Sequence, residues 1–303
     1  RLRGLGSLGP DEPLLVFRRS RADAGVESRR VTRVLRVSPT PDERTLFRAL
    51  DGYARRVWRD APAATAPAAR LAMMVLARRA ASSAASLARS IERRLGLLDD
   101  PEQKRALQLV LPLGDGVVRD DEEPGVELGA PGLPDAAAER QWLQRIHALA
   151  GLAMQRESKI AALDRILRRA GEPAIVFTEY RDTLERLGNV LAPRAAAPEM
   201  AGDGPACEAF ATLHGGLTVA EREHQARRFT HGDAPVLLAS DAASEGLNLH
   251  RRCRLVINLE VPWTPLRLEQ RIGRVDRLGQ DRRVHAIGLV GRGTADEAVV
   301  AAL

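Results

Sequence analysis

The chain has 303 residues and a formal net charge of +6, with 46 Lys and Arg against 40 Asp and Glu. This length allows one large domain or two modest ones, each with a hydrophobic core. No apolar run is long enough to cross a bilayer, and Cys207 and Cys253 lie far apart with no Cys or His at metal-site spacing. These features argue against a membrane protein, a disulfide framework and a zinc site. We expect a cytoplasmic protein, and the charge favours a polyanionic partner, although a GC-rich genome would also explain the excess of arginine.

Helical patterns dominate the first third of the chain. We interpret residues 1–37 as the tail of a preceding lobe and its linker. Thr40 and Glu43 form a capping box, with proline at the first helical position, which predicts a helix over 41–59. Further apolar residues at helical spacing follow, and we therefore predict an all-helical insertion over 38–97.

The remainder of the chain predicts an α/β domain. Residues 98–135 are rich in Asp, Glu, Gly and Pro and lack periodicity, which predicts a flexible acidic linker. From 136 to 303, apolar strands alternate with segments of helical period after two helices near 136–150 and 157–170. We predict strands near 174–178, 209–214, 235–240, 254–259 and 284–290. Such alternation is typical of a parallel sheet flanked by helices.

The most specific segment is Q-R-I-G-R-V-D-R-L-G-Q at 270–280. Arg274 and Arg277 are three positions apart, so on one face of a helix their guanidinium groups lie about one turn apart. Two such groups can bind an oxyanion cluster, as the stabilisation of a phosphoryl group in transfer requires. A solvated basic helix face is the alternative, which the flanking Gln270 and the two glycines disfavour. We predict that Arg274 and Arg277 are catalytic arginine fingers.

This segment resembles motif VI of helicase superfamily two, and its R-L-G-Q ending is similar to the Swi/Snf branch. Upstream, residues 237–249 resemble motif V of the same superfamily. By the family's pattern, Ser240 would contact a nucleic-acid phosphate. Gly246 and Asn248, together with Gln270, would face the nucleotide.

Two weaker segments extend the resemblance over residues 151–290. A-I-V-F-T-E-Y from residue 174 is similar to motif IV, and L-H-G-G from residue 213 resembles a neighbouring phosphate-contacting motif. They imply nucleic-acid contacts from Thr178, His214 and Gly215. Each has a structural alternative, since Thr178 would also suit a helix cap and His214 a core position. The helical segment, with R-R-A-A-S-S at 78–83, looks like that of bacterial RapA-like members.

The resemblance implies that residues 136–303 are a RecA-like C-terminal lobe of an ATP-dependent DNA translocase or helicase-like motor. Neither Lys104 nor Lys159 stands in a G-K-[ST] sequence, and no Asp-Glu pair at a strand end matches a Walker B motif. ATP and Mg²⁺ would therefore be bound mainly by a first lobe of the same polypeptide. We expect this chain to be inactive alone, and the full-length protein to be a DNA-stimulated ATPase with duplex DNA as partner and RNA polymerase or another complex as a further one.

Two rival interpretations remain at this stage. A degenerate lobe would serve as a nucleic-acid or protein docking module without ATPase activity, which the presence of both arginines disfavours. An RNA helicase lobe would share the superfamily motifs, although the R-L-G-Q ending favours the Swi/Snf branch. Stimulation of the ATPase by DNA or by RNA would separate these readings.

Overall fold

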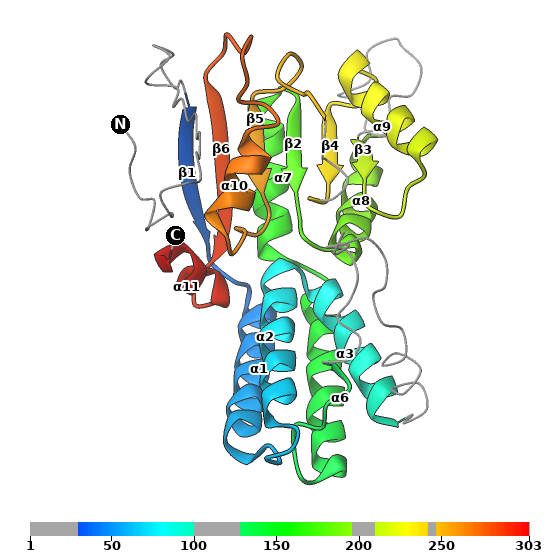
Figure 1. Ribbon diagram of the computed structural model, residues 1–303, viewed down its shortest axis with the longest axis vertical. Helices are drawn as coiled ribbons and strands as arrows, with labels where there is room; N and C mark the ends of the chain where they lie inside the picture. Colours follow the sequence, from blue (N-terminus) through cyan, green and yellow to red (C-terminus); the bar gives the residue numbers. More distant parts are fainter. Residues whose placement is uncertain (1–29, 100–127, 196–209, 242–246, 303) are drawn as a thin grey trace, which may run out of the picture.

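The computed structural model describes residues 30–99, 128–195, 210–241 and 247–302, and the statements below concern these residues. They form two units, a helical unit and a sheet unit, stacked along the long axis of the molecule (Figure 1). Among these residues, no helix combines the length and apolar character needed to cross a membrane.

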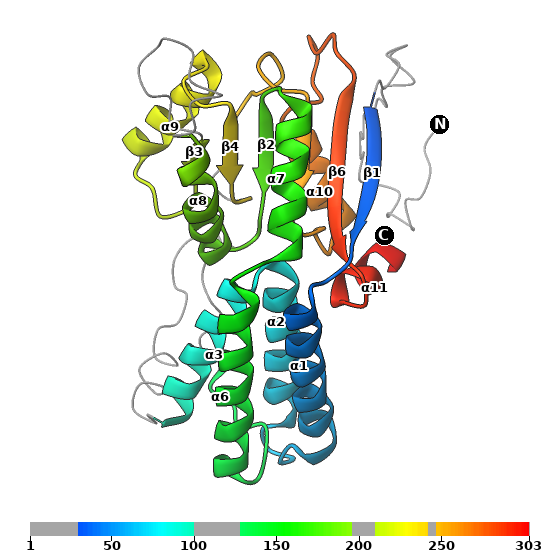
Figure 2. The ribbon, with the colours of Figure 1, turned by 180° about the vertical axis from the view of Figure 1, so that it is seen from behind.

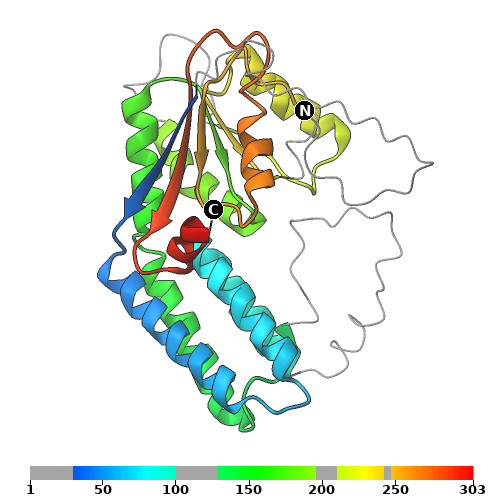
Figure 3. The same cartoon turned by 60° about the vertical axis from the view of Figure 1, so that its left-hand side comes forward.

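The sheet unit contains six described strands, all parallel, in the order β1-β6-β5-β2-β4-β3. The strands are β1 (Arg30–Val37), β2 (Ala174–Phe177), β3 (Phe210–Leu213), β4 (Val236–Ala239), β5 (Leu255–Asn258) and β6 (Val284–Gly291). The five strands expected from the sequence are all present, which confirms the predicted parallel α/β fold. The sixth, β1, lies in the segment that was predicted to be a tail and linker; it pairs with β6 at the sheet edge (Figure 3).

Helices cover both faces of the sheet. Successive residues of a strand point to opposite faces, so Ile175 and Phe177 pack on the side of α10 (Pro265–Ile272), whereas Ala174 and Val176 pack on the other side. That other side is covered by α7 (Ser158–Ala170) and α8 (Arg181–Ala195), seen in front of the sheet in Figure 2. The remaining helices of this unit are α9 (Val219–His231) and α11 (Ala295–Ala302). Burial on both faces explains the continuous apolar strands.

The helical unit is built from α1 (Pro41–Asp60), α2 (Ala66–Ser82), α3 (Ala84–Asp99) and α6 (Ala136–Ala153). The capping box predicted at Thr40 and Glu43 is present at the start of α1. The sequence boundaries placed α6 in the RecA-like lobe, but its apolar residues Leu143 and Ile146 are fully buried in the core of the helical unit. Leu128, inside the predicted linker of 98–135, is buried in that core too, whereas residues 100–127 lie outside the described part.

A buried ion pair lies inside the helical unit. Arg94 of α3 and Glu139 of α6 are 0% and 1% exposed, and their side chains are 2.6 Å apart. The Tyr53 hydroxyl also donates to Glu139, at 2.6 Å, and the Arg94 guanidinium donates to the carbonyls of Leu128 and Ala130. Both charges are thereby compensated and hydrogen-bonded, as burial requires.

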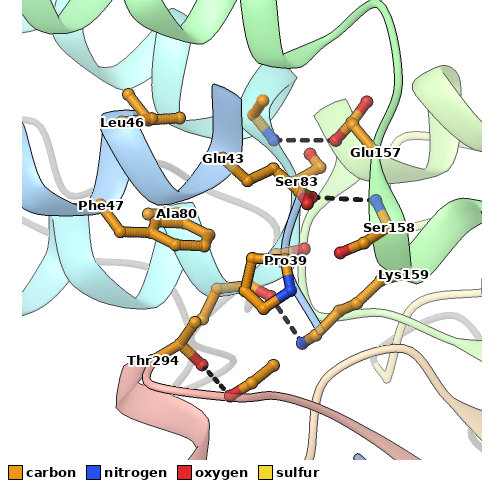
Figure 4. Close-up of a pocket in the computed structure, with 14 residues that line it drawn as sticks. Pro39, Glu43, Leu46, Phe47, Ala80, Ser83, Glu157, Ser158, Lys159 and Thr294 are labelled. Atoms are coloured by element: carbon orange, nitrogen blue, oxygen red, sulfur yellow. Dashed lines mark hydrogen bonds between the residues drawn. The ribbon is translucent and has the colours of Figure 1, made fainter. Parts of the chain in front are cut away.

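Polar contacts fasten the helical unit to the sheet unit (Figure 4). The backbone N–H of Ala84 donates to Glu157 at 2.9 Å, and that of Ser158 donates to Glu43 at 2.9 Å. Lys159 donates to the carbonyl of Ala81 at 2.7 Å and forms an ion pair with Asp296. Because these groups are buried or half-buried and paired, the α2–α3 turn is held firmly against the carboxyl edge of the sheet.

Candidate nucleotide and nucleic-acid site

Arg274 and Arg277 lie in a loop and not on a helix. Helix α10 ends at Ile272, and residues 273–280, here called the arginine loop, continue in turns. A further helical turn would use the carbonyls of Gly273 and Arg274, but the Arg277 Nε donates to the first at 2.9 Å and the Leu249 N–H to the second at 3.0 Å. The predicted helix face is therefore wrong, although the two arginines remain close in the chain.

The three arginines of the motif differ sharply in exposure. Arg271 is 2% exposed and its guanidinium forms an ion pair with Asp241 at 2.5 Å. Arg274 and Arg277, in contrast, are half-buried at the surface. The residues predicted to be fingers are thus the two that an incoming ligand can reach.

Two further predicted nucleotide-contacting residues lie on the surface near this loop. Asn248 is exposed, and its neighbour Leu249 is joined to Arg274 by the backbone hydrogen bond described above. Gln270 is exposed near the end of α10. Gly246 lies outside the described residues. The fold therefore brings Asn248 beside the arginine loop.

Gln280 braces the arginine loop, a role that motif spacing does not reveal. Its Nε2 donates to the carbonyls of His250 at 2.6 Å and Cys253 at 3.0 Å. The preceding Gly279 has φ +89°, a conformation that glycine adopts readily. The final G-Q of the R-L-G-Q sequence thus closes the loop onto the segment before β5.

The predicted nucleic-acid residues lie at the carboxyl ends of neighbouring strands, and they differ in accessibility. His214 and Gly215 follow β3 in a half-exposed turn. Thr178 and Ser240 follow β2 and β4, and both are 0% exposed. The Thr178 hydroxyl donates to Glu260 at 2.6 Å, so in this conformation it bonds to another side chain and not to a ligand at the surface.

Five buried or half-buried charges gather at this edge, and we call Arg78, Glu179, Asp241, Glu260 and Arg271 the carboxyl-edge cluster. Arg78 of α2 pairs with Glu179 at 2.6 Å, and the Glu179 N–H donates to the Glu260 carboxylate. The Arg271 guanidinium donates to the Glu260 carbonyl at 3.2 Å and to Asp241 at 2.5 and 2.7 Å. The cluster joins α2 to the ends of β2, β4 and β5 and to α10.

The pKa of Glu260 is shifted well above its ordinary value. Burial, followed by the neighbouring Glu179 carboxylate, raises the pKa of Glu260 to about 7. Arg271 and the hydrogen bond from Thr178 oppose this rise. Arg78, Tyr180 and Asp296 line the same small pocket as Glu260. Three carboxylates in the cluster face two guanidinium groups, and a proton on Glu260 balances that excess of negative charge.

This raised pKa predicts a stability that depends on pH. Between the ordinary value of 4.5 and about 7, the folded protein holds a proton on Glu260 that the unfolded chain has released. The contribution is therefore complete below pH 4.5 and is lost as pH rises to 7, by roughly 3 kcal/mol in total. Glu260→Gln should remove this dependence. Urea unfolding of both proteins at pH 5 and pH 7.5 measures it, and parallel pH profiles would contradict the assignment.

Comparison with known proteins shows what this part of the chain is similar to. Residues 158–279 match the helicase conserved C-terminal domain. The chain is 32% identical over 143 residues to the uncharacterized ATP-dependent helicase YqhH of Bacillus subtilis (strain 168). The matched segment covers 47% of this chain and 23% of that protein. It is 36% identical over 124 residues to the RNA polymerase-associated protein RapA of Yersinia pestis (strain Pestoides F), covering 40% of this chain and 12% of RapA. The chain thus matches less than a quarter of the length of these relatives.

Solved structures share the fold. The C-terminal part of the Fun30 ATPase domain superposes with a TM-score of 0.55 at 16% identity, covering 90% of this chain and 88% of the other. The Hef helicase domain of Pyrococcus furiosus superposes with a TM-score of 0.54 at 16% identity, covering 90% and 58%. The parallel sheet, the motif residues and these likenesses agree: residues 158–279 resemble the helicase conserved C-terminal domain, on a fold that solved helicase and ATPase-domain structures share.

Proposed function

We propose that the chain is the C-terminal half of an ATP-dependent, DNA-stimulated translocase, and that it supplies the arginine fingers Arg274 and Arg277. The supporting observation is their placement: both are half-buried at the surface of a loop that backbone and Gln280 contacts hold in place. Fixed guanidinium donors at an accessible surface suit a phosphoryl group in transfer, because they need little reorganisation when charge develops.

The chemistry of these side chains suits ATP phosphates and not a metal ion. Guanidinium groups are donors without acceptor capacity, so they bind phosphate oxygens and repel Mg²⁺. The proposal assigns Mg²⁺ and the phosphate-binding loop to a first lobe of the same polypeptide. Gln270, Asn248 and Gly246 would then complete the nucleotide-facing surface from this side. Mg²⁺ would neutralise phosphate charge, and the arginines would orient the γ-phosphate of the ATP held by the first lobe.

The nucleic-acid track is proposed at the carboxyl ends of β3 and β4. We place the phosphate contacts at the half-exposed turn of His214 and Gly215, which lies at the surface. Ser240 and Thr178 lie behind this surface, and a contact from either hydroxyl requires a local opening, because both are fully buried. Contacts of this kind read no bases, so binding should be independent of sequence and sensitive to salt.

The partners of the whole protein are also part of the proposal. The relative RapA is named as associated with RNA polymerase. We extend that association, and with it a cytoplasmic location, to the protein that contains this chain. Duplex DNA is the proposed track.

Steady-state ATP hydrolysis by the full-length protein tests this function. We expect duplex DNA to stimulate turnover, and added salt to reduce the stimulation by weakening phosphate contacts. Parallel assays with duplex DNA, single-stranded RNA and no nucleic acid separate the alternatives. Stimulation by RNA alone would indicate an RNA helicase, and DNA binding without any hydrolysis would indicate a docking module.

A further inference from the structure

We infer that Arg78, on α2 of the helical unit, is a positioning residue for the arginine loop and acts on it through Glu179, Glu260 and Arg271. The inference rests on the proposed function, in which Arg274 and Arg277 act in ATP hydrolysis. The contacts between the two units are independent of that role.

Arg78 touches the sheet unit at two places. Its guanidinium pairs with Glu179, directly after β2, at 2.6 Å. The same group lies over the ring of Trp263, 4.9 Å from its centroid. Trp263 stands two residues before the start of α10, the helix that leads into the arginine loop. One side chain of the helical unit thus contacts both the end of β2 and the entrance of α10.

The contact continues through Glu260 into α10. The Glu260 carboxylate accepts hydrogen bonds from the Glu179 N–H and from the Thr178 hydroxyl. The Glu260 carbonyl accepts from Arg271 at 3.2 Å. Glu179 and Glu260 are only 5% and 4% exposed, so water does not screen the charges of this chain of contacts.

Arg271 connects the carboxyl-edge cluster to the arginine loop. Its guanidinium is fixed by Asp241 at the end of β4, by the Asn258 side chain at 3.0 Å and by the face of Phe177. The backbone carbonyl of Arg271 accepts from the Arg274 N–H at 3.2 Å. A shift of Arg271 therefore moves the first turn of the arginine loop directly.

Two carboxylate oxygens of the cluster already lack a hydrogen-bond donor. Among the described residues, Glu179 Oε1 and Glu260 Oε2 are buried and already accept no hydrogen bond. Removal of Arg78 would leave the buried Glu179 carboxylate without its guanidinium partner, which favours rearrangement or protonation of the glutamates. The remaining junction contacts, such as those of Lys159 and Glu157, would keep the helical unit docked.

Hydrogen–deuterium exchange of the 303-residue chain tests this coupling without any ATPase assay. We expect Arg78→Ala to raise the exchange rate of peptides covering 268–280 about tenfold, because a hydrogen bond to a charged group is lost at the cluster. Arg70→Ala is the matched control, since Arg70 lies on the same helix and also covers a tryptophan, Trp58, at 4.9 Å. It should leave exchange in 268–280 unchanged.

The second arm measures hydrolysis by the full-length protein. Arg78→Ala should lower kcat at saturating duplex DNA about tenfold with KM for ATP unchanged, and Arg78→Lys, which keeps the positive charge beside Glu179, should restore part of it. Glu179→Gln serves as the second variant if Arg78→Ala does not fold, with the same expected exchange in 268–280. Unchanged exchange, or an equal response to Arg70→Ala, overturns the coupling. A wild-type protein without ATPase activity but with the exchange effect overturns the proposed function and leaves the coupling intact.

Discussion

Alanine at Arg274 or Arg277 is expected to reduce DNA-stimulated ATP hydrolysis by the full-length protein at least roughly a thousand-fold, the lower end of what an arginine finger contributes. In the proposed function each guanidinium would stabilise charge that develops on the γ-phosphate, so the loss of either one should slow the chemical step. Single-turnover hydrolysis with bound ATP measures the loss in the chemical step. ATP affinity should change far less, because the interaction forms mainly in the transition state.

The controls separate a catalytic loss from a structural one. Arg283→Ala removes an exposed arginine of the turn before β6 and should leave turnover unchanged. Arg277→Ala also removes the hydrogen bond to the Gly273 carbonyl, which contributes about 1 kcal/mol, so its thermal unfolding is recorded beside that of Arg274→Ala. Lysine at either position keeps the charge but loses the planar fork, and should rescue little. Wild-type turnover in either alanine variant would refute the finger assignment.

Local patterns predicted most of the fold. Strands β2 and β4 are continuously apolar because both of their faces are covered, and the capping box at Thr40 marks a helix start that depends only on residues three apart. Strand β1 escaped prediction because it lies at the sheet edge with most of its side chains exposed, and arginines interrupt its apolar residues. The periodicity of α6 shows that it packs, but not that its partners are α1 and α3.

The site was predictable as a set of residues and not as a geometry. Spacing places Arg271, Arg274 and Arg277 in one run, and it cannot tell which of them is buried. That choice depends on Asp241 and Asn258, which reach Arg271 from the ends of β4 and β5. The burial of Thr178 likewise depends on Glu260, which is 82 residues away in the chain.

The helical unit is expected to lose most of its stability when the buried ion pair between α3 and α6 is broken. Glu139→Ala leaves the Arg94 guanidinium, which is 0% exposed, without its carboxylate, and removes the acceptor of the Tyr53 hydroxyl and of the Gly132 and Leu133 N–H groups. Removal of one partner of such a pair destabilises by about 3–5 kcal/mol, a large share of a domain's total stability. Urea unfolding followed by circular dichroism measures the change.

An exposed pair across the same two helices provides the control. Glu92 of α3 and His147 of α6 are 2.8 Å apart, but their side chains are 60% and 41% exposed. Glu92→Ala should therefore cost less than about 1 kcal/mol, because water screens this pair. A comparable loss in both variants would contradict the argument from burial. The double variant Arg94→Met with Glu139→Leu should recover stability relative to Glu139→Ala, since apolar side chains of similar volume leave no buried charge unpaired.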